Sequence, residues 1–274
     1  MDKELLFQKR YAFNVWDINS AKAVIDAAIG KERPIFLQIS SKVFDEIDSD
    51  EFITSTKNYI FKNKADVIIH LDHSRDIEQI CRAIELGWDS VMYDGSHLSI
   101  EDNIFNTMKV VKIANKHKVL VEGEIGQVLG VEDDISVDKE VKITIEDIER
   151  FITLTGIDLL AVAIGTAHGQ YGGNKPNINY ELLGQIANLT KVPFVIHGGS
   201  ELSDETLKKL WTFENVKKIN ISTDIKQAYR KGILESMRKG LLEEKGFDAL
   251  RVEKQIFETI KSVAVSKLKV LEEI

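Results

Sequence analysis

Cysteine and long apolar runs are scarce in this sequence of 274 residues, and each shortage excludes a class of protein. The single cysteine, Cys81, rules out an intramolecular disulfide and is typical of a reducing cytoplasm. The longest apolar run, Leu159–Ile164, is far shorter than the roughly 20 residues that span a bilayer. Residues 1–10 mix charged with apolar side chains, unlike a signal peptide. We therefore predict a cytoplasmic protein without a membrane partner.

Positive charge is outnumbered as well. The 36 basic side chains face 44 acidic ones, which gives a net charge of -8. This field repels a polyanion, so we expect no nucleic-acid partner, although a small anion can still bind at a local positive site. Only three prolines interrupt the chain, and 43% of it is hydrophobic, enough for one large core.

Short β-rich runs alternate with helical patterns along most of the chain, and several are apolar enough to be covered on both faces. The eight runs are Tyr11–Val15, Pro34–Ser40, Val67–Leu71, Ser90–Tyr93, Val119–Glu124, Leu159–Ile164, Phe194–His197 and Val216–Ile221. Eight β–α alternations predict an α/β fold, a (β/α)8 TIM barrel, and disfavour an open doubly wound sheet. We expect one domain over 1–274, with the barrel at about 11–243 and extra C-terminal helices at about 247–274.

Two segments depart from this alternation. Gly126–Val141 is a long acidic connection, and loops of this length are usually functional lids or disordered segments. The C-terminal extension carries an apolar stripe that includes Val252, Ile256 and Ile260. This stripe is expected to pack across the base of the barrel or against another subunit.

Polar side chains follow nearly every predicted strand, at the end where a barrel of this kind holds its chemistry. They are Asn14, Ser40, Asp72, His73, Asp94, Glu124, His168, His197 and Asn220. Three imidazoles from different strands can form a catalytic zinc site with an open fourth position. The alternative is that each histidine is a hydrogen-bonded core residue, and His70 is expected to fill the barrel in that way.

The carboxylates have several possible roles. Asp72 precedes His73 and suits proton transfer to a molecule bound at the metal. Asp94 and Glu124 can ligate a second metal, orient the histidines, or cap the following helix. Glu132 lies in the acidic connection, either as a solvated side chain or as a carboxylate that a closing loop delivers to the site.

Glycine-rich turns follow the last three predicted strands, around Gly169, Gly198 and residues 220–224. Glycine lets backbone N–H groups approach an anion, and the late loops of a TIM barrel usually hold phosphate. Each turn alone is weak evidence, because glycine serves any tight turn. Together the turns predict a phosphorylated small substrate beside the metal.

These motifs resemble those of the class II, metal-dependent ketose-bisphosphate aldolases. The matching segments are Tyr-Ala-Phe-Asn-Val at 11–15, His-Leu-Asp-His at 70–73, Ser-Val-Met-Tyr-Asp-Gly-Ser-His-Leu at 90–98, Glu-Gly-Glu-Ile-Gly at 122–126, Ala-Val-Ala-Ile-Gly-Thr-Ala-His-Gly at 161–169, His-Gly-Gly-Ser at 197–200 and Lys-Ile-Asn-Ile-Ser-Thr-Asp at 218–224. They stand in family order, and the combination is specific although single pieces are not.

The resemblance implies a reversible aldol cleavage of tagatose or fructose 1,6-bisphosphate to dihydroxyacetone phosphate and an aldehyde such as glyceraldehyde 3-phosphate. Catalytic Zn²⁺ would be bound by His73, His168 and His197, and a second divalent site would involve Asp94 and Glu124. Asp72 would act as acid/base on the C4 oxygen, and Glu132 would exchange the C1 proton. The residues expected to bind the substrate and its phosphate are Asn14, Ser40, Gly169, Gly198, Ser200, Asn220, Ser222 and Thr223. The resemblance also implies a monovalent cation, Na⁺ or K⁺, a homodimer or homotetramer, and a place in carbohydrate metabolism such as glycolysis.

Departures from the family pattern bear on the substrate. Ser222 stands where fructose-specific members carry aspartate, and the loop at 130–137 resembles the tagatose-bisphosphate branch. Glu201 replaces the glycine that usually follows His-Gly-Gly-Ser, and the C-terminal Asp-Pro-Arg element is missing. Recognition of a distal phosphate is therefore open, and a phosphorylated ketose is the safer expectation.

Two alternatives stay open at this point. The chain could be an aldolase of a ketose phosphate that lacks the distal phosphate, or a non-catalytic partner subunit of such an aldolase. A metal-dependent barrel hydrolase is disfavoured, because no early His-x-His pair is present. No lysine stands at a predicted strand end where it would suit a Schiff base, which disfavours the metal-free aldolase mechanism.

Overall fold

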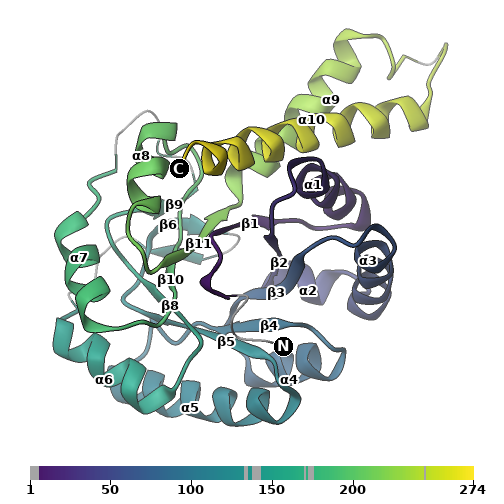
Figure 1. Ribbon diagram of the computed structural model, residues 1–274. Coiled ribbons are helices and arrows are strands. Elements are labelled where there is room, and N and C mark those ends of the chain that lie inside the picture. Colours follow the sequence, from purple (N-terminus) through teal and green to yellow (C-terminus); the bar gives the residue numbers. More distant parts are fainter. Residues whose placement is uncertain (1–5, 133–134, 138–142, 170, 172–175, 244) are drawn as a thin grey trace.

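Eight parallel strands close into a barrel in this computed structural model, which describes residues 6–132, 135–137, 143–169, 171, 176–243 and 245–274 (Figure 1). The barrel strands are β1 (Arg10–Asn14), β2 (Ile35–Ser40), β3 (Val67–Ser74), β4 (Ser90–Tyr93), β5 (Leu120–Ile125), β8 (Leu159–Val162), β10 (Phe194–Ile196) and β11 (Val216–Ile221). They neighbour one another in chain order, and β11 pairs with β1 to complete the ring. The predicted TIM barrel is confirmed, and closure excludes the open sheet.

An outer layer of helices surrounds the barrel. Its members are α1 (Ile18–Lys31), α2 (Ser41–Glu46), α3 (Ser49–Asn63), α4 (Ile77–Glu85), α5 (Ile100–His117), α6 (Ile145–Thr155), α7 (Tyr180–Leu189), α8 (Asp204–Trp211), α9 (Thr223–Arg238) and α10 (Ala249–Val270), with a final 3-10 turn at Leu271–Glu273. Hydroxyl and carboxylate side chains begin most of them: Asp17 and Thr144, for example, each accept a hydrogen bond from the third helical N–H.

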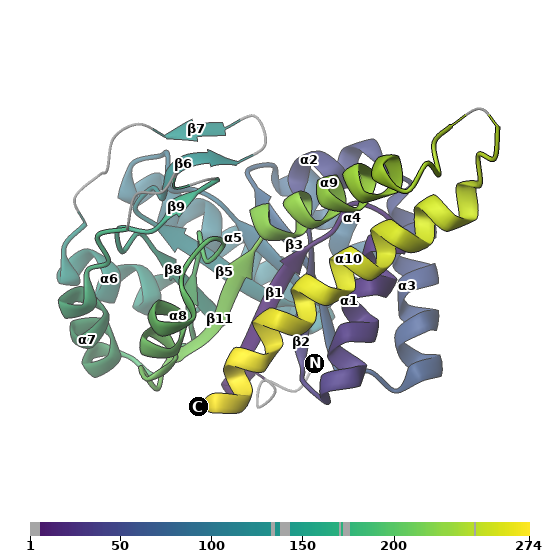
Figure 2. The ribbon, with the colours of Figure 1, turned by 90° about the horizontal axis from the view of Figure 1, so that it is seen from above.

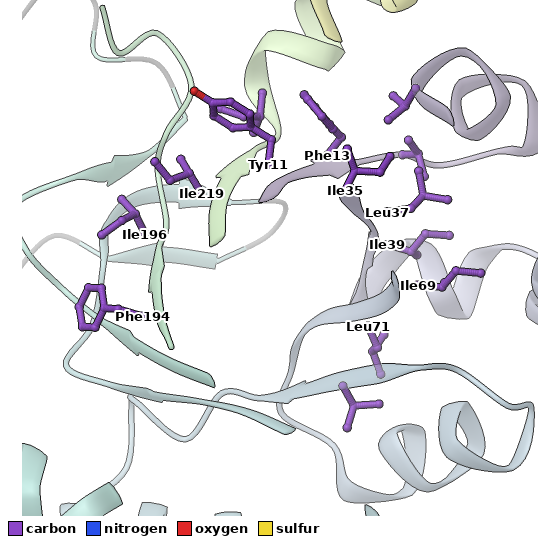
Figure 3. Packing of buried hydrophobic residues seen from close by; sticks show 14 of the residues in the cluster. Tyr11, Phe13, Ile35, Leu37, Ile39, Ile69, Leu71, Phe194, Ile196 and Ile219 are labelled. Carbon is purple, nitrogen blue, oxygen red and sulfur yellow. The ribbon is translucent and has the colours of Figure 1, made fainter. Parts of the chain in front are cut away.

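The barrel strands are buried on both faces, and alternate residues enter two different cores. Tyr11, Phe13 and Leu37 belong to the large cluster between the strands and the helices, as Figure 3 shows. Ala12 and Phe36, one position along, belong to a small apolar cluster inside the barrel. This two-residue period is the ordinary alternation of a β-strand.

The inward-facing positions change from apolar to polar along the strands. In β3, Ile68 joins the small inner cluster, whereas His70 and Asp72 are fully buried polar residues. In β5, Leu120 is likewise apolar, and the next inward positions are Glu122 and Glu124. The carboxyl ends of the strands therefore converge on a polar interior, which is the end where TIM barrels hold their sites.

Two strands of a small second sheet lie within the acidic connection that the sequence presented only as a loop, and the third follows β8. β6 (Leu129–Glu132) pairs antiparallel with β7 (Ile135–Val137) and parallel with β9 (Ala167–His168). Figure 2 shows this sheet at one end of the barrel, with the C-terminus toward the opposite end. The short runs were missed because strands of two to four residues leave almost no periodic signal.

The C-terminal helix α10 lies along the outer wall of the barrel. It packs against α9 and α1 and not across the barrel base, which was one of its two expected positions (Figures 1 and 2). The end of α9 and the start of α10 project together beyond the barrel. No helix in the described part of the chain is long and apolar enough to cross a bilayer.

Candidate metal centre and active site

Three histidines meet at the polar end of the barrel, as the sequence predicted. His73 lies in β3, His168 in β9, and His197 directly follows β10. One ring nitrogen from each lies within 4.8 Å of the other two. Among the described residues this is the only group of histidine, cysteine or carboxylate side chains close enough to hold a metal ion together.

His73 reaches this cluster because β3 is irregular. Successive strand residues normally face opposite sides of the sheet, yet the side chains of Asp72 and His73 both lie at the polar end of the barrel interior. The register between β3 and β4 shifts between Leu71 and Ser74, and His73 has a left-handed φ of 52°. This bulge costs conformational energy and re-aims one side chain, as bulges beside active sites commonly do.

The ring of His197 is oriented by a buried carboxylate. Its Nε2 lies 2.8 Å from Glu122 Oε1, and its Nδ1 lies 2.8 Å from His73 Nε2. A ring nitrogen that donates to a carboxylate leaves the other nitrogen with its lone pair. Because Nε2 of His197 faces Glu122, Nδ1 is the ring nitrogen that points to the centre of the histidine cluster. This arrangement of neutral imidazoles backed by a carboxylate fits a divalent metal such as zinc.

Asp94 and Glu124 lie on the other side of His73. The Nδ1 atom of that ring is 3.9 Å from Asp94 Oδ2 and 3.6 Å from Glu124 Oε2. Burial opposes ionisation of Asp94, but the neighbouring His73 ring, the hydrogen bond from Ser96 and the charge of Arg75 hold its pKa below the usual range. Burial and the charge of Asp94 raise the pKa of Glu124 well above its usual range. Both carboxylates are thus placed to orient His73, and their part in a second metal site stays a prediction.

Glu122 also makes a buried ion pair, which the sequence reading missed. Its Oε2 accepts a hydrogen bond from Lys218 Nζ at 2.8 Å, and neither side chain is exposed. Burial opposes ionisation of Glu122, yet the charges of Lys218 and the nearby histidines hold its pKa below the usual range. His70 fills the barrel beside this pair, as expected, with Nδ1 2.8 Å from Ser90 Oγ. The predicted site residues were taken from the strand ends. Glu122 and Lys218 each lie two residues before such a position, Glu124 in β5 and Asn220 in β11.

Asp72 is fully buried and held by three amides. Asn14 Nδ2 and Gln38 Nε2 each donate to Oδ2 at 2.9 Å, and Asn220 Nδ2 lies 3.5 Å from Oδ1. The opposite ends of two amides, Gln38 Oε1 and Asn220 Oδ1, are buried without a hydrogen-bond partner among the described residues. A buried carbonyl oxygen of this kind can accept a hydrogen bond from a hydroxyl group of a bound polyol. Asn14 and Asn220 were expected here, and Gln38 was missed.

Six of the eight residues predicted to bind the substrate and its phosphate line one pocket, together with His168 and His197. Its walls are His168, Gly169, His197, Gly198, Ser200, Asn220, Ser222, Thr223 and Lys226. Thr223 begins α9, and helix N-termini attract phosphate. The side chain of Ser222 does not cap this helix, but Ser200 Oγ accepts hydrogen bonds from Ser222 N at 3.1 Å and Asp224 N at 3.3 Å. At Gly198, φ is +68° and an added Cβ would lie 2.3 Å from Ala167 O, so only glycine fits. Lys226 adds a cation that the sequence reading missed.

A second cavity of about 250 Å³ adjoins this pocket. It is lined by Asn14, Val15, Trp16, Ser40, Val43, Lys226 and Tyr229. The rings of Trp16 and Tyr229 meet edge to face, with centroids 5.3 Å apart. Ser40, a predicted substrate residue, therefore lies with Asn14 on this side and not in the pocket beside the histidines. The wall is largely apolar and aromatic, with one lysine.

Glu132 lies in β6, where its backbone pairs with Ile135. The same strand contacts the histidine cluster, because Gly130 pairs with His168. The carboxylate itself lies outside the described residues, so its delivery to the site stays a prediction.

Comparisons with known proteins agree with this geometry. The model of the family described as fructose-bisphosphate aldolase class-II matches residues 10–274. A sulfofructosephosphate aldolase from Alkalicoccus urumqiensis is 34% identical over 229 residues, which are 83% of this chain and 79% of that protein. A 6-phospho-5-dehydro-2-deoxy-D-gluconate aldolase from Shouchella clausii (strain KSM-K16) is 35% identical over 216 residues, 77% and 72% of the two chains. The crystal structure of the YdjI aldolase from Escherichia coli K12 aligns with a TM-score of 0.79 and 27% identity, covering 96% and 91% of the chains.

Proposed function

The chain belongs to the class-II fructose-bisphosphate aldolase family and is an aldehyde-lyase, and we propose that it cleaves a ketose 1-phosphate reversibly to dihydroxyacetone phosphate and an aldehyde. One observation carries the proposal. The histidine cluster, the buried Asp72 and the phosphate pocket adjoin one another at the polar end of the barrel. A non-catalytic partner subunit would have no use for all three groups together.

The metal site is proposed to consist of His73, His168 and His197, with zinc as the ion. A bound divalent ion supplies Lewis-acid stabilisation of the negative charge that develops on the substrate oxygen when the carbon–carbon bond breaks. The family generally uses a divalent metal, and three imidazoles with an open fourth position are typical of catalytic zinc. Asp94 and Glu124 are proposed for a second divalent site, and the glycine-rich loops for Na⁺ or K⁺.

Asp72 is proposed as the acid/base for the C4 hydroxyl group. Asn14 and Gln38 donate to one carboxylate oxygen and hold it still, which leaves Oδ1, beside Asn220, for the substrate hydroxyl. A carboxylate placed in this way can take the C4 proton during cleavage and return it during synthesis. Glu132 is proposed to exchange the C1 proton of dihydroxyacetone phosphate from β6, the strand that pairs with His168.

The phosphate pocket and the second cavity suggest how a ketose 1-phosphate lies in the site. Its phosphate would bind among Gly198, Ser200 and Thr223, at the start of α9, and the aldehyde half would enter the cavity beside Trp16 and Tyr229. Tagatose and fructose 1,6-bisphosphate remain the reference substrates of this proposal, with the tagatose branch a prediction.

A substrate without a distal phosphate is the second candidate, and the cavity wall favours it. Lys226 is the one cation among the residues that line this cavity, and it also lines the pocket proposed for the first phosphate. The names of the two relatives point the same way, because one substrate is a sulfonated fructose phosphate and the other a phosphorylated sugar acid. A distal sulfonate or carboxylate would carry one charge and match one lysine.

We further propose that the protein acts as a homo-oligomer in the cytoplasm. The projecting end of the α9–α10 pair exposes Met237, Leu242, Phe247 and Leu250. Exposed apolar groups gathered at one projection usually mark a protein interface, and a second copy of the chain would cover them. Light scattering of the Phe247→Glu/Leu250→Glu double variant should show a smaller particle than the wild type.

A coupled assay for dihydroxyacetone phosphate release tests the proposed reaction. Tagatose 1,6-bisphosphate, fructose 1,6-bisphosphate and a ketose 1-phosphate that ends in a sulfonate would be compared, each with zinc and with a chelator. Chelator-sensitive release is expected, with the singly charged distal group preferred. Metal-loaded protein that releases no dihydroxyacetone phosphate from any of these, or from a wider set of ketose 1-phosphates, would contradict the assignment.

A further inference from the structure

Tyr171 joins the two loops that carry His168 and His197. Its hydroxyl donates to the carbonyl oxygen of Gly198 at 2.8 Å and accepts a hydrogen bond from Ala167 N at 2.9 Å. Ala167 directly precedes one of these histidines, and Gly198 directly follows the other. A single phenol thereby fixes the backbone beside two proposed metal ligands.

Glu201 holds Tyr171 from the opposite side. Its Oε2 accepts a hydrogen bond from the backbone N–H of Tyr171 at 2.8 Å. Glu201 itself has a left-handed φ of 57°, which costs a residue with a side chain about 1–2 kcal/mol. Glycine would adopt this conformation freely, and glycine is the residue that the family pattern leads one to expect here. The strain therefore suggests that the carboxylate has a role which glycine cannot supply.

The backbone of Glu201 is held by a residue at the start of α9. Its backbone N–H donates to both oxygens of Asp224, at 3.2 and 3.3 Å. Asp224 lies in the first turn of α9 and forms an ion pair with Lys267 Nζ of α10 at 2.7 Å. Both side chains of this ion pair are mostly buried, which makes it less screened by solvent than an exposed pair. The chain of contacts thus runs from α10 to the loops of the metal centre.

We propose that Tyr171 and Glu201 form a positioning clamp, which holds the His168 and His197 loops at the spacing that one divalent ion requires. The inference rests on the three-histidine ligand set proposed above. Residues that orient metal ligands typically change metal affinity by about 10- to 100-fold when they are replaced. Neither residue of the clamp is placed as a ligand or as an acid/base.

Metal affinity tests the clamp without reference to any substrate. The zinc-loaded protein would be titrated with a chromophoric chelator, and its dissociation constant compared for wild type, Tyr171→Phe, Glu201→Gly and Glu201→Gln. Tyr171→Phe and Glu201→Gly should each weaken zinc binding by about 10- to 100-fold. Glu201→Gln keeps an oxygen that can accept from Tyr171 N, so it should bind zinc within a few-fold of the wild type.

Thermal unfolding of the metal-free variants separates positioning from general stability. Glu201→Gly relieves a left-handed residue, so a purely structural role predicts an unchanged or higher melting temperature and unchanged zinc affinity. The clamp predicts weaker zinc binding despite that relief. Glu32 has a similar φ of 49° at the end of α1, so Glu32→Gly is the matched control and should leave zinc affinity unchanged.

Two results would overturn the clamp. One is wild-type zinc affinity in both Tyr171→Phe and Glu201→Gly, and the other is a loss in Glu201→Gln as large as that in Glu201→Gly. Wild-type protein that binds no zinc would instead overturn the ligand set, and the clamp with it.

Discussion

Glu122 and Lys218 form an ion pair inside the barrel, with 2.8 Å between Oε2 and Nζ and no exposure of either side chain. The other oxygen of Glu122 lies 2.8 Å from His197 Nε2. The pair thus connects the packed interior to the metal centre. Buried ion pairs contribute little net stability, yet removal of one partner is costly because it leaves a buried charge.

Removal of the Glu122 charge alone should therefore destabilise the fold. We expect Glu122→Gln to lower the free energy of unfolding by about 3–5 kcal/mol, and the Glu122→Gln/Lys218→Met double variant to recover much of that loss. Urea unfolding of both proteins measures the difference. Zinc affinity should be lower than wild type in both variants, since His197 lacks its carboxylate in each. Equal stability of the single variant and the wild type would argue against the buried pair.

Replacement of a proposed metal ligand should lower metal content. His197→Ala removes one of three imidazoles, so purified protein should carry far less zinc by elemental analysis. His117 is exposed near the end of α5, and His117→Ala is the matched control that should retain full zinc. A fully loaded His197→Ala protein would mean that the ligand set is wrong.

Removal of the metal should lower stability without unfolding the barrel. A ligand at 100 times its dissociation constant stabilises the native state by about 2.7 kcal/mol. We expect a chelator to lower the melting temperature by several degrees and zinc to restore it. His197→Ala should show almost no shift on chelation, which separates the site from non-specific zinc binding. A chelator shift of the same size in that variant would place the ion elsewhere.

Asp72 should matter for the reaction and not for the metal. Asp72→Asn retains the shape of the side chain but cannot take the C4 proton, so kcat should fall by about 100-fold or more. Zinc content should remain at the wild-type value, because Asp72 belongs to the amide network with Asn14 and Gln38. Measurement of kcat and zinc content in the same preparation distinguishes a role in the reaction from a role in metal binding. Unchanged cleavage would remove Asp72 from the mechanism.

The contact between α9 and α10 depends on a glycine. A Cβ at Gly232 would lie 2.7 Å from Ile256 Cα, so the helices would have to separate. Gly232→Ala should lower the free energy of unfolding by about 1–3 kcal/mol, although alanine favours a helix. Gly184 of α7 has no atom within 4 Å of the same position. Gly184→Ala should instead raise stability by up to about 1 kcal/mol, and similar effects at both positions would contradict the packing.

Alkaline pH should weaken the contact between α3 and α1. Burial and the hydrogen bond to Asp26 raise the pKa of Tyr59 from 10.0 to about 12. The folded state therefore favours the protonated phenol, so its contribution is complete below pH 10 and is lost as pH rises toward 12. Urea unfolding at pH 8.5 and 11 should show a larger loss for wild type than for Tyr59→Phe. Equal losses would exclude this linkage.

Much of the architecture was readable from the chain because its signals are local. Alternation of β-rich and helical segments predicted all eight barrel strands, and hydroxyl caps such as Ser99 and Thr144 mark helix starts directly. The histidines, Asp72 and the glycine-rich turns followed once the fold was inferred, since strand ends converge in a closed barrel. Polarity at those ends is a property of the sequence itself.

Tertiary structure alone decided how these groups face one another. Glu122 meets Lys218 across the barrel, 96 residues apart, because strand register places both on the same inner layer. The bulge at His73 and the choice of Nδ1 on His197 also arise from contacts between distant strands. Lys226 and the Tyr171–Glu201 clamp depend on loops that approach only when the barrel closes. Periodicity specifies which side of a strand a residue faces, whereas long-range pairing specifies what it faces there.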